Sequence, residues 1–322
     1  MKLFFRLVKK AFLSIVRFPS DLVQMVCAAW YLLKMRRDPS CVYFLCPFGI
    51  GDTLFLASFM KEYKVNENVG TVCFIVKQSH KDLPGMFSGV DKVIVSDHEV
   101  KTLRFFAKKI RKYRFGNFFY GHFILEPGWP EPGLLLGVNN ISLVDIYRHA
   151  VLRLPSDCLP EKGSLTMPES ELEAYDKQFA GQKNVVVLMP NAITVERLDP
   201  SFWETLAQKL AERGYTVYTN VLSTREAHIK GTQSLILPLK EFFCLSRRYR
   251  WSCIALRSGI CDLLGFSDIR CTVLYGSKDS CSAWNMKNLR LPNKNITDVT
   301  IQYDSEFSET YKTILSHYPA VD

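Results

Sequence analysis

The sequence predicts an α/β fold in which two doubly wound, Rossmann-like domains face each other across a cleft, preceded by an amphipathic helical segment. Three observations lead to this prediction. The 322 residues are enough for about two domains. Short apolar runs alternate with amphipathic stretches in two successive series, which is typical of parallel sheets covered by helices on both faces. Residues 155–183 are richer in Pro, Glu, Ser and Lys and separate the two series.

Composition excludes several other classes of protein. Hydrophobic residues make up 48% of the chain and charged residues 23%, which is typical of a soluble globular protein. A mainly disordered chain, a coiled coil and a collagen-like repeat are therefore excluded. No uninterrupted apolar run reaches the ~18 residues that a membrane-spanning helix needs, so we expect none.

The basic charge of the chain is concentrated at its N-terminal end. The first 37 residues hold eight basic residues and one acidic residue, so +7 of the net charge of +9 belongs to this end and +2 to the other 285 residues. Placed on a helix, the five cations of residues 1–18 fall within one sector of about 100°, and hydrophobic side chains fill the rest. Pro19 interrupts this pattern, and a second helix is expected over Leu22–Met35.

A basic amphipathic segment of this kind can lie in the headgroup plane of an anionic membrane. We therefore expect residues 1–37 to hold a cytoplasmic protein on the inner face of the cytoplasmic membrane. The alternative is a helix packed on the protein's own core with solvated lysines. Nucleic-acid binding is disfavoured because the body offers no further basic stripe with interleaved aromatic residues. A secretory signal is disfavoured because no small-residue cleavage site follows.

The first α/β series reads as alternating buried strands and amphipathic helices. Its expected strands are Cys41–Cys46, Thr71–Val76, Lys92–Val95 and Phe118–Leu125, and its expected helices are Thr53–Tyr63, Val100–Tyr113 and Ile141–Leu154. A Pro/Gly-rich loop, Glu126–Gly133, follows the fourth strand.

The second series repeats the pattern. Its expected strands are Asn184–Met189, Thr216–Asn220, Ser234–Leu237, Ser252–Leu256 and Cys271–Tyr275, and its expected helices are Ser201–Arg213, Leu239–Arg247, Ser258–Phe266 and Ser305–His317. Gly214 is expected to end the first of these helices. The expected organisation is 1–40 basic amphipathic helices, 41–165 N-terminal Rossmann-like domain, 166–300 C-terminal Rossmann-like domain and 301–322 C-terminal helix.

Cysteine and histidine usage gives no metal-binding pattern. None of the ten cysteines forms a Cys-x-x-Cys pair and the six histidines are scattered, so we expect no metal site. Cysteines in apolar stretches of a long chain are typical of a reducing compartment, where the thiols pack as small hydrophobes.

The first candidate constellation follows the first strand. Gly49 and Gly51 let the backbone approach a ligand closely at a helix start. A carboxylate at this position, Asp52, faces the predicted cleft and can take a proton from a hydroxyl group. The alternative is an N-cap aspartate that only stabilises its helix.

The second constellation is the loop after the first strand of the second domain. Asn191 and Thr194 lie in a small polar loop, and Arg197 follows six residues before Trp203, where it can contact phosphate. The alternative is an ordinary surface loop in which Arg197 pairs with Glu196 or Asp199. Further candidates, which follow the next strand, are Asn220, Ser223 and Glu226.

The third constellation joins the Ser252–Leu256 strand to a helix. Ser258 and Gly259 can present amides and a hydroxyl to an anion, and the guanidinium group of Arg257 can donate two hydrogen bonds to a diphosphate. Asp262 can accept from Arg257 or from a ribose. An internal Arg–Asp pair that braces the junction is the alternative, and the two roles are compatible. In the first domain, His122 and Glu126 flank the aromatic loop and are candidates on the acceptor side. A lone histidine on an apolar strand is more often a core residue.

These residues together resemble the lipopolysaccharide heptosyltransferase group, glycosyltransferase family 9. The resemblance covers roughly residues 41–280. It is carried, in chain order, by the Gly-Asp pair after the first strand, the Pro-Asn-Ala loop, the helix with Trp203, the Ser-Gly loop and the run Val273–Gly276. It implies a GT-B fold, a metal-independent inverting reaction without a cofactor, an acceptor bound by the N-terminal domain and a nucleotide-sugar donor held mainly by the C-terminal domain.

Individual positions match the family motifs unevenly. By position, Asp52 matches the family's proposed base, and Arg197 matches a basic position that contacts the donor. Ser258 and Gly259 match the middle of an Asp-Ser/Thr-Gly-x-x-His motif. Arg257 stands where the family has the aspartate and Asp262 stands near its histidine, so the motif does not specify heptose as the sugar.

The sequence thus predicts a bacterial glycosyltransferase that moves a sugar from a nucleotide-sugar to a lipid-linked or polysaccharide acceptor in cell-surface glycan assembly. One rival is a non-catalytic nucleotide-sugar-binding or assembly protein on the same fold. Another is a nucleotide-sugar-modifying enzyme such as an epimerase. It is disfavoured because neither a Tyr-x-x-x-Lys pair nor a full Gly-x-Gly-x-x-Gly fingerprint is present.

Overall fold

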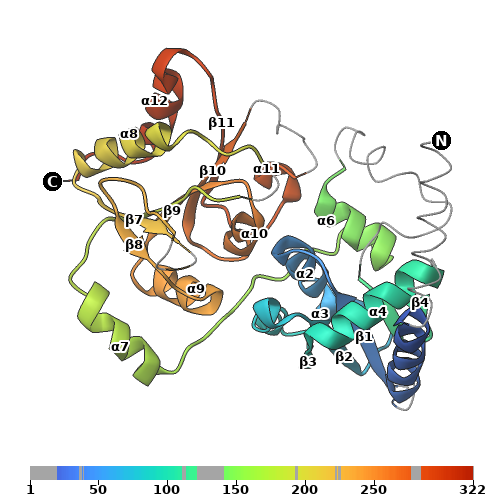
Figure 1. Ribbon diagram of the computed structural model, residues 1–322. Coiled ribbons are helices and arrows are strands. Elements are labelled where there is room, and N and C mark those ends of the chain that lie inside the picture. The colour runs from blue at the N-terminus through green and yellow to red at the C-terminus, as the bar shows by residue number, and fades with distance from the viewer. Residues whose placement is uncertain are drawn as a thin grey trace, which may run out of the picture.

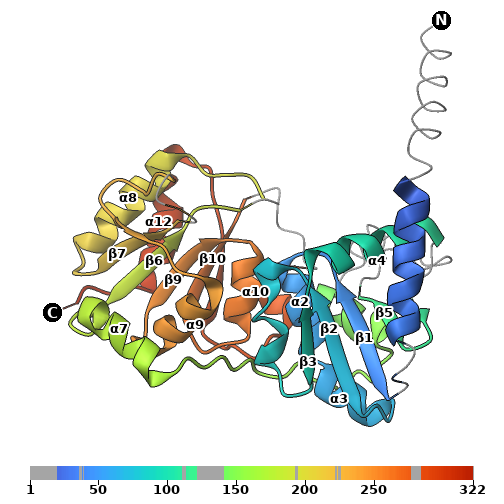
Figure 2. The ribbon, with the colours of Figure 1, turned by 60° about the horizontal axis from the view of Figure 1, so that its bottom comes forward.

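Two sheets lie side by side in the computed structural model, each flanked by helices (Figures 1 and 2). The sheet formed by β1 to β5, with its helices, is called the N-terminal lobe. The sheet formed by β6 to β11, with its helices, is called the C-terminal lobe. The described residues are 20–35, 38, 40–110, 114–121, 141–192, 195–221, 223, 226–276 and 284–321.

The N-terminal lobe has strand order β3-β2-β1-β5-β4, in which only the β4–β5 pair is antiparallel. The central strands are continuous apolar runs, as expected for strands buried on both faces. The strands are β1 (Cys41–Cys46), β2 (Thr71–Val76), β3 (Lys92–Val95), β4 (Arg114–Phe115) and β5 (Phe118–Tyr120). The helices are α2 (Ile50–Ala57), α3 (Met60–Asn66), η1 (Gln78–His80), η2 (Pro84–Met86), α4 (Asp97–Ile110), α6 (Leu143–Asp145) and the π-helix η4 (Ile146–Val151).

The C-terminal lobe has strand order β11-β10-β9-β6-β7-β8, and all its pairs are parallel. Counted within the lobe, this is the Rossmann order 3-2-1-4-5-6 read from the other edge. The strands are β6 (Val185–Met189), β7 (Thr216–Asn220), β8 (Gln233–Leu235), β9 (Ser252–Leu256), β10 (Arg270–Tyr275) and β11 (Ile296–Thr300). The helices are α7 (Glu169–Phe179), α8 (Pro200–Ala211), α9 (Leu239–Arg248), α10 (Gly259–Gly265), α11 (Met286–Leu289), η5 (Ser305–Phe307) and α12 (Ser308–Ser316).

The predicted α/β class with two Rossmann-like sheets is confirmed, but some elements differ. The helix expected from Thr53 starts earlier, at Ile50, and is divided into α2 and α3. The boundary segment 155–183 was expected to interrupt the alternation of strands and helices, but it contains helix α7. The sequence reading also missed α11 and β11. Of the predicted strand Phe118–Leu125, the residues after Gly121 lie outside the described part of the chain.

Residues 20–35 form one helix, called here the N-terminal helix, which packs on the N-terminal lobe beside α4. Its residues Ala28 and Met35 are buried in a cluster with Leu103 of α4 and Phe118 of β5. No helix among the described residues is long and apolar enough to cross a bilayer. The nine cysteines that the structure describes are all free.

The lobes share one apolar core at their boundary. Phe266, which follows α10, makes aromatic contacts with Phe87 and Phe55 of the N-terminal lobe, with ring centroids 5.2 Å and 6.3 Å apart. Residues of both lobes belong to the same buried cluster. Helices α2 and α10 lie against each other at this boundary (Figure 2).

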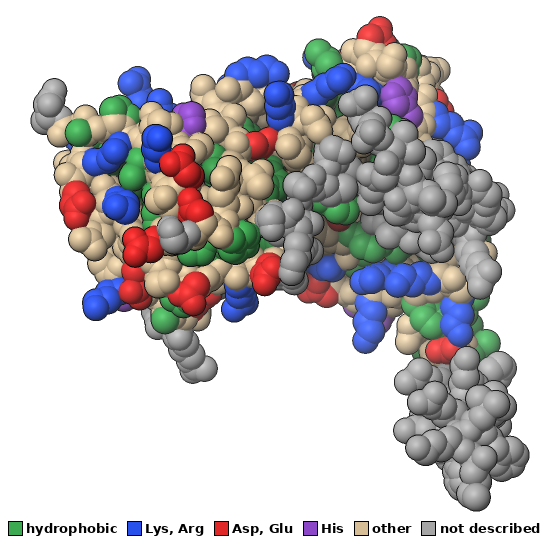
Figure 3. All heavy atoms as spheres, turned by 90° about the horizontal axis from the view of Figure 1, so that it is seen from above, with side chains coloured by type: hydrophobic (Ala, Val, Ile, Leu, Met, Phe, Trp, Pro, Cys, Tyr) green, Lys and Arg blue, Asp and Glu red, His purple; other side chains and the backbone are tan. Residues whose placement is uncertain are grey.

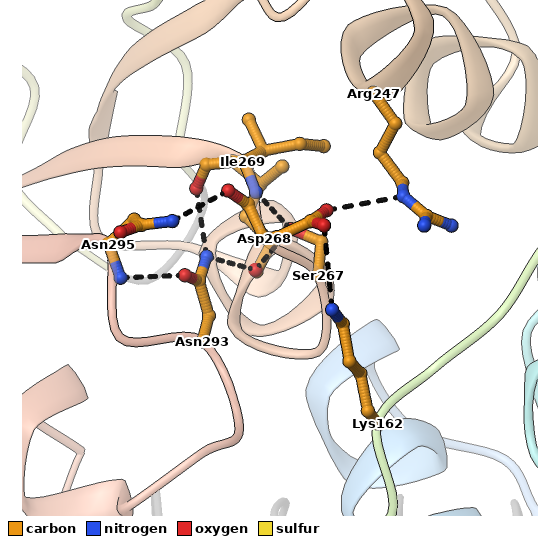
Figure 4. Close-up of polar contacts among 8 residues, drawn as sticks. Lys162, Arg247, Ser267, Asp268, Ile269, Asn293 and Asn295 are labelled. Atoms are coloured by element: carbon orange, nitrogen blue, oxygen red, sulfur yellow. Dashed lines mark hydrogen bonds and ion pairs between the residues drawn. The ribbon is translucent and has the colours of Figure 1, made fainter.

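The chain crosses between the lobes through residues 155–168 and is bound to both of them. On the N-terminal side, the Glu161 amide donates to the Ser58 carbonyl at 2.9 Å. On the C-terminal side, the Gly163 amide donates to the Phe266 carbonyl at 3.0 Å. Lys162 Nζ lies 3.5 Å from an oxygen of Asp268, whose other oxygen lies 3.2 Å from Arg247 Nε of α9 (Figure 4).

Candidate functional site

Each sheet has one point where the strand order reverses, and ligands of such sheets bind beyond the carboxyl ends of the strands there. In the N-terminal lobe this point lies between β1 and β5, and in the C-terminal lobe between β6 and β9. Asp52 follows β1. The predicted loop 190–197 follows β6, and Arg257 follows β9. The three sequence constellations therefore lie at the two positions that the topology favours.

Asp52 lies in the first turn of α2, whose N-cap is Gly49. One carboxylate oxygen, Oδ2, accepts from the Gly49 amide at 3.1 Å, and the other, Oδ1, accepts from the hydroxyl of Tyr147 at 2.7 Å. Asp52 is thus not the N-cap residue of the alternative interpretation, although it closes the capping box from the third helical position. Burial raises the pKa of Asp52, and the two hydrogen bonds oppose part of that rise. A carboxylate with a raised pKa is a stronger proton acceptor.

Two residues near Asp52 were missed by the sequence analysis. Tyr147 is fully buried and reaches Asp52 from η4, 95 positions later in the chain. His80, the last residue of η1, which follows β2, is 7% exposed, and its Nδ1 lies 3.4 Å from the Thr53 hydroxyl of α2. Burial lowers the pKa of His80 to about 4, so this ring is neutral near pH 7. His80 comes shortly after the strand β2, at the edge of the sheet where ligands bind. This position in the sequence was the signal that could have identified it.

Arg257 and Asp262 form a buried pair at the junction of β9 and α10. Arg257 Nη2 donates to Asp262 Oδ1 at 2.7 Å, and both side chains are about nine-tenths buried or more. The other guanidinium nitrogens donate to main-chain carbonyls: Nε to Trp284 at 2.8 Å and Nη1 to Ser258 at 2.7 Å. The internal brace that the sequence left open is therefore present. A direct contact of Arg257 with a donor diphosphate stays a prediction.

The first and third constellations meet at the lobe boundary. A Cβ placed on Gly51 would lie 2.3 Å from Asp262 Oδ2, and one placed on Gly259 would lie 3.0 Å from the Cβ of Ile50. Only glycine fits such a close approach of two helix starts. The Asp52 charge also contributes to the raised pKa of Asp262, of which burial is the main cause. The structure thus brings Asp52 near the Arg257–Asp262 pair.

The second constellation is brought together only in part. Asn191 Nδ2 donates to the Glu226 carboxylate, and the Glu226 amide donates to the Ser223 carbonyl at 3.1 Å. These residues therefore connect the loops after β6 and β7, and Asn220 is the last residue of β7.

Arg197 is exposed on the loop after β6. In the described part of the chain, no hydrogen bond or ion pair joins Arg197 to Glu196 or Asp199, nor to Asp52. Asp199 instead caps α8 by accepting from the Ser201 amide at 2.8 Å. The predicted site residues Thr194, His122 and Glu126 lie outside the described residues.

Metal ligands are not clustered. Within the residues that the structure describes, no group of three or more His, Cys, Asp or Glu side chains could hold a metal ion. The metal-independent reaction remains a prediction that rests on the resemblance of the sequence.

No protein-family model matches the sequence, and no curated protein matches it significantly. Solved structures do match over most of the chain. ADP-heptose LPS heptosyltransferase II of E. coli has a TM-score of 0.56 at 16% identity, covering 86% of this chain and 96% of that chain. A glycosyl transferase family 9 protein of Veillonella parvula has a TM-score of 0.57 at 12% identity, covering 87% and 92%. The E. coli heptosyltransferase WaaC with ADP-2-deoxy-2-fluoro heptose has a TM-score of 0.50 at 12% identity, covering 86% and 98%. The chain therefore has the GT-B fold of the heptosyltransferases of glycosyltransferase family 9.

Proposed function

We propose that this protein is an inverting, metal-independent glycosyltransferase that moves a sugar from a nucleotide-sugar to a lipid-linked or polysaccharide acceptor in bacterial cell-surface glycan assembly. The observation that carries the proposal is the position of Asp52. Its carboxylate follows β1 at the switch point of the N-terminal lobe, is held by Tyr147 and Gly49, and is close enough to Asp262 of α10 for its charge to raise the pKa of that residue. The GT-B fold and the heptosyltransferase-like neighbours support the same class of reaction.

In the proposed step, Asp52 takes the proton of an acceptor hydroxyl. The acceptor oxygen forms a bond to the anomeric carbon of the sugar from the face opposite the leaving nucleotide. The bond from that carbon to the diphosphate oxygen breaks, and the electron pair goes to the diphosphate. The raised pKa of Asp52 makes it a stronger base than a fully solvated aspartate.

The donor side is assigned to the C-terminal lobe. Ser258 and Gly259 begin α10, where amides can face the leaving diphosphate, and Arg257 braces the same junction from inside. Arg197, exposed on the loop between β6 and α8, is proposed to offer a positive charge to the diphosphate. Asn191, Asn220, Ser223 and Glu226 lie on neighbouring loops and are proposed to contact the nucleoside or the sugar.

The test of this function is a transfer assay with a panel of nucleotide-sugars and Asp52→Asn. Asparagine keeps the shape of the side chain but takes no proton, so turnover is expected to fall about 10²- to 10⁴-fold. The matched control is Asp157→Asn, an exposed carboxylate on the segment that crosses between the lobes, which is expected to keep full turnover. Equal turnover of Asp52→Asn and the wild-type protein would refute the proposed base.

A second candidate is a nucleotide-sugar-binding or assembly protein without turnover. The observation that favours it is the close approach of Ile50 to the start of α10, where the diphosphate is expected: a Cβ added to Gly259 would lie 3.0 Å from the Cβ of Ile50. A thermal-shift screen with nucleoside diphosphates and nucleotide-sugars separates the two, because ligands that bind the native state raise its Tm. A raised Tm without transfer to any acceptor would favour the second candidate.

A further inference from the structure

The N-terminal helix is apolar on two opposite faces. Its inner face is fixed to α4 by the buried residues Ala28 and Met35. At its edges Asp21 pairs with Lys109 of α4 at 2.9 Å, and the Tyr31 hydroxyl lies 3.1 Å from Nδ1 of His98. The helix is therefore anchored to the lobe without using its outer face.

The outer face carries large hydrophobic side chains in solvent. Five of the eleven exposed large hydrophobic residues among those described lie on this 16-residue helix. At about 100° per residue they fall within an arc of roughly 100°, which is the width of an interfacial helix face. They are called the outer stripe and are Leu22 (55% exposed), Val23 (61%), Val26 (62%), Trp30 (59%) and Leu33 (60%).

We propose that the outer stripe docks on the surface of an anionic phospholipid bilayer. Apolar side chains on one helix face, with cations at its edges, are the chemistry that binds such a surface. Lys34 lies at the edge of the stripe, with its Nζ 5.6 Å from the ring centre of Trp30. A tryptophan at the border between apolar and charged groups suits the headgroup region.

Helix α4, on which the N-terminal helix packs, carries more basic than acidic side chains. Lys101, Lys108 and Lys109 are exposed on it, against Asp97 and Glu99 in its first turn. Asp21, the acidic residue of the N-terminal helix, is paired with Lys109. In the sequence, residues 1–19 carry five cations and no acid. Figure 3 shows Lys and Arg side chains beside hydrophobic ones at this end of the N-terminal lobe.

The same charges argue against a second copy of the chain as the partner. Residues 1–37 carry a net charge of +7 in the sequence, so two copies of this segment repel each other, and like charges oppose association. An anionic bilayer attracts the same segment instead. The stripe lies at the end of the N-terminal lobe away from the C-terminal lobe, so docking leaves the lobe boundary accessible (Figure 2). The inference is independent of the proposed transfer reaction.

The test is vesicle co-sedimentation of the full chain and of the double variant Val26→Gln/Trp30→Gln. Vesicles of mixed phosphatidylcholine and phosphatidylglycerol are expected to bind the wild-type chain, and binding is expected to weaken with added salt. The double variant is expected to lose at least about tenfold in affinity, because two large apolar side chains no longer leave water. Phosphatidylcholine vesicles alone are expected to bind far less of either chain.

The matched control is Val65→Gln/Leu159→Gln, which removes two hydrophobic side chains that are 79% and 71% exposed elsewhere. It is expected to bind like the wild-type chain. Unchanged affinity of the stripe variant, or no vesicle binding by the wild-type chain, would overturn the proposal. A dimer in analytical ultracentrifugation that the stripe variant converts to monomer would also overturn it, in favour of a second copy.

Discussion

Two strand-to-helix junctions face each other across the lobe boundary, and each carries an aspartate in the first turn of its helix. After β1, Asp52 is only partly buried and is held by a tyrosine hydroxyl and an amide. After β9, Asp262 is buried and its charge is balanced by Arg257. Similar local patterns thus give, on one side, the carboxylate that we propose as the proton acceptor and, on the other side, a buried ion pair. The two carboxylates differ in their partners and not in their place in the helix.

The largest stability effect that this comparison predicts is at the junction after β9. Arg257→Ala leaves the buried Asp262 carboxylate without its cation, which is expected to cost about 3–5 kcal/mol of unfolding free energy. Urea denaturation measures the loss. The double variant Arg257→Met/Asp262→Ala removes both charges and is expected to recover part of it. A fully stable Arg257→Ala protein would show that the pair is not structural and would erase the contrast with Asp52.

A second effect is an acid sensitivity at His80, which follows β2 and lies against Thr53 of α2. Burial holds the pKa of His80 at about 4, below its ordinary 6.5. Between pH 4 and pH 6.5, His80 therefore binds a proton in the unfolded chain but not in the folded chain. The contribution of this group to the unfolding free energy is fully present above pH 6.5 and is lost as the pH drops towards 4. The loss from this group is about 3 kcal/mol. His80→Gln is expected to flatten the dependence of unfolding free energy on pH over this range. An unchanged slope would contradict the neutral, buried state.

The contact between the two junctions is tested by Gly51→Ala. The added Cβ would meet Asp262 Oδ2 at 2.3 Å, so either the Asp262 side chain must leave its pairing with Arg257 or the two helices must move apart, at an expected cost of about 1–3 kcal/mol. Gly85→Ala is the matched control, because a Cβ there would have no atom within 4 Å. Thermal denaturation of both variants gives the comparison. Equal Tm values would mean that the two helix starts are not in tight contact in solution.

The smallest effect is expected at Tyr147, a positioning residue for Asp52. Tyr147→Phe removes the hydrogen bond that stabilises the ionised carboxylate, so the pKa of Asp52 should rise further. Since the base must be ionised, the acidic limb of the pH–rate profile for transfer is expected to move to higher pH, with turnover at the optimum lowered about tenfold or less. A purely structural role would lower turnover without moving the limb.

Much of the fold could be predicted because its strands are apolar runs between turn residues. Cys41–Cys46, Thr71–Val76 and Ser252–Leu256 are strands at the predicted residues. Their carboxyl ends also placed Asp52 and Arg257 at the correct edges, because parallel strands gather those ends together. Helix α7 was missed although Leu172, Tyr175 and Phe179 recur at helical spacing in its sequence.

The partners in the site could not be predicted, because they depend on tertiary packing. Tyr147 joins Asp52 from a π-helix whose residues carry no local signal for that contact. The contact of Gly51 with Asp262 depends on how the two lobes meet. The sequence left open whether Arg257 binds a ligand or Asp262, because both uses need the same residue types at the same spacing.

The aromatic seam between the lobes has a consequence for dissecting the protein. Phe266 sits against Phe87 and Phe55 from the other half, so a fragment ending before residue 166 would display those rings to water. Neither half is then a good stand-alone product for expression. A protease that cuts the crossing between the halves should leave two pieces that migrate together until a denaturant is added.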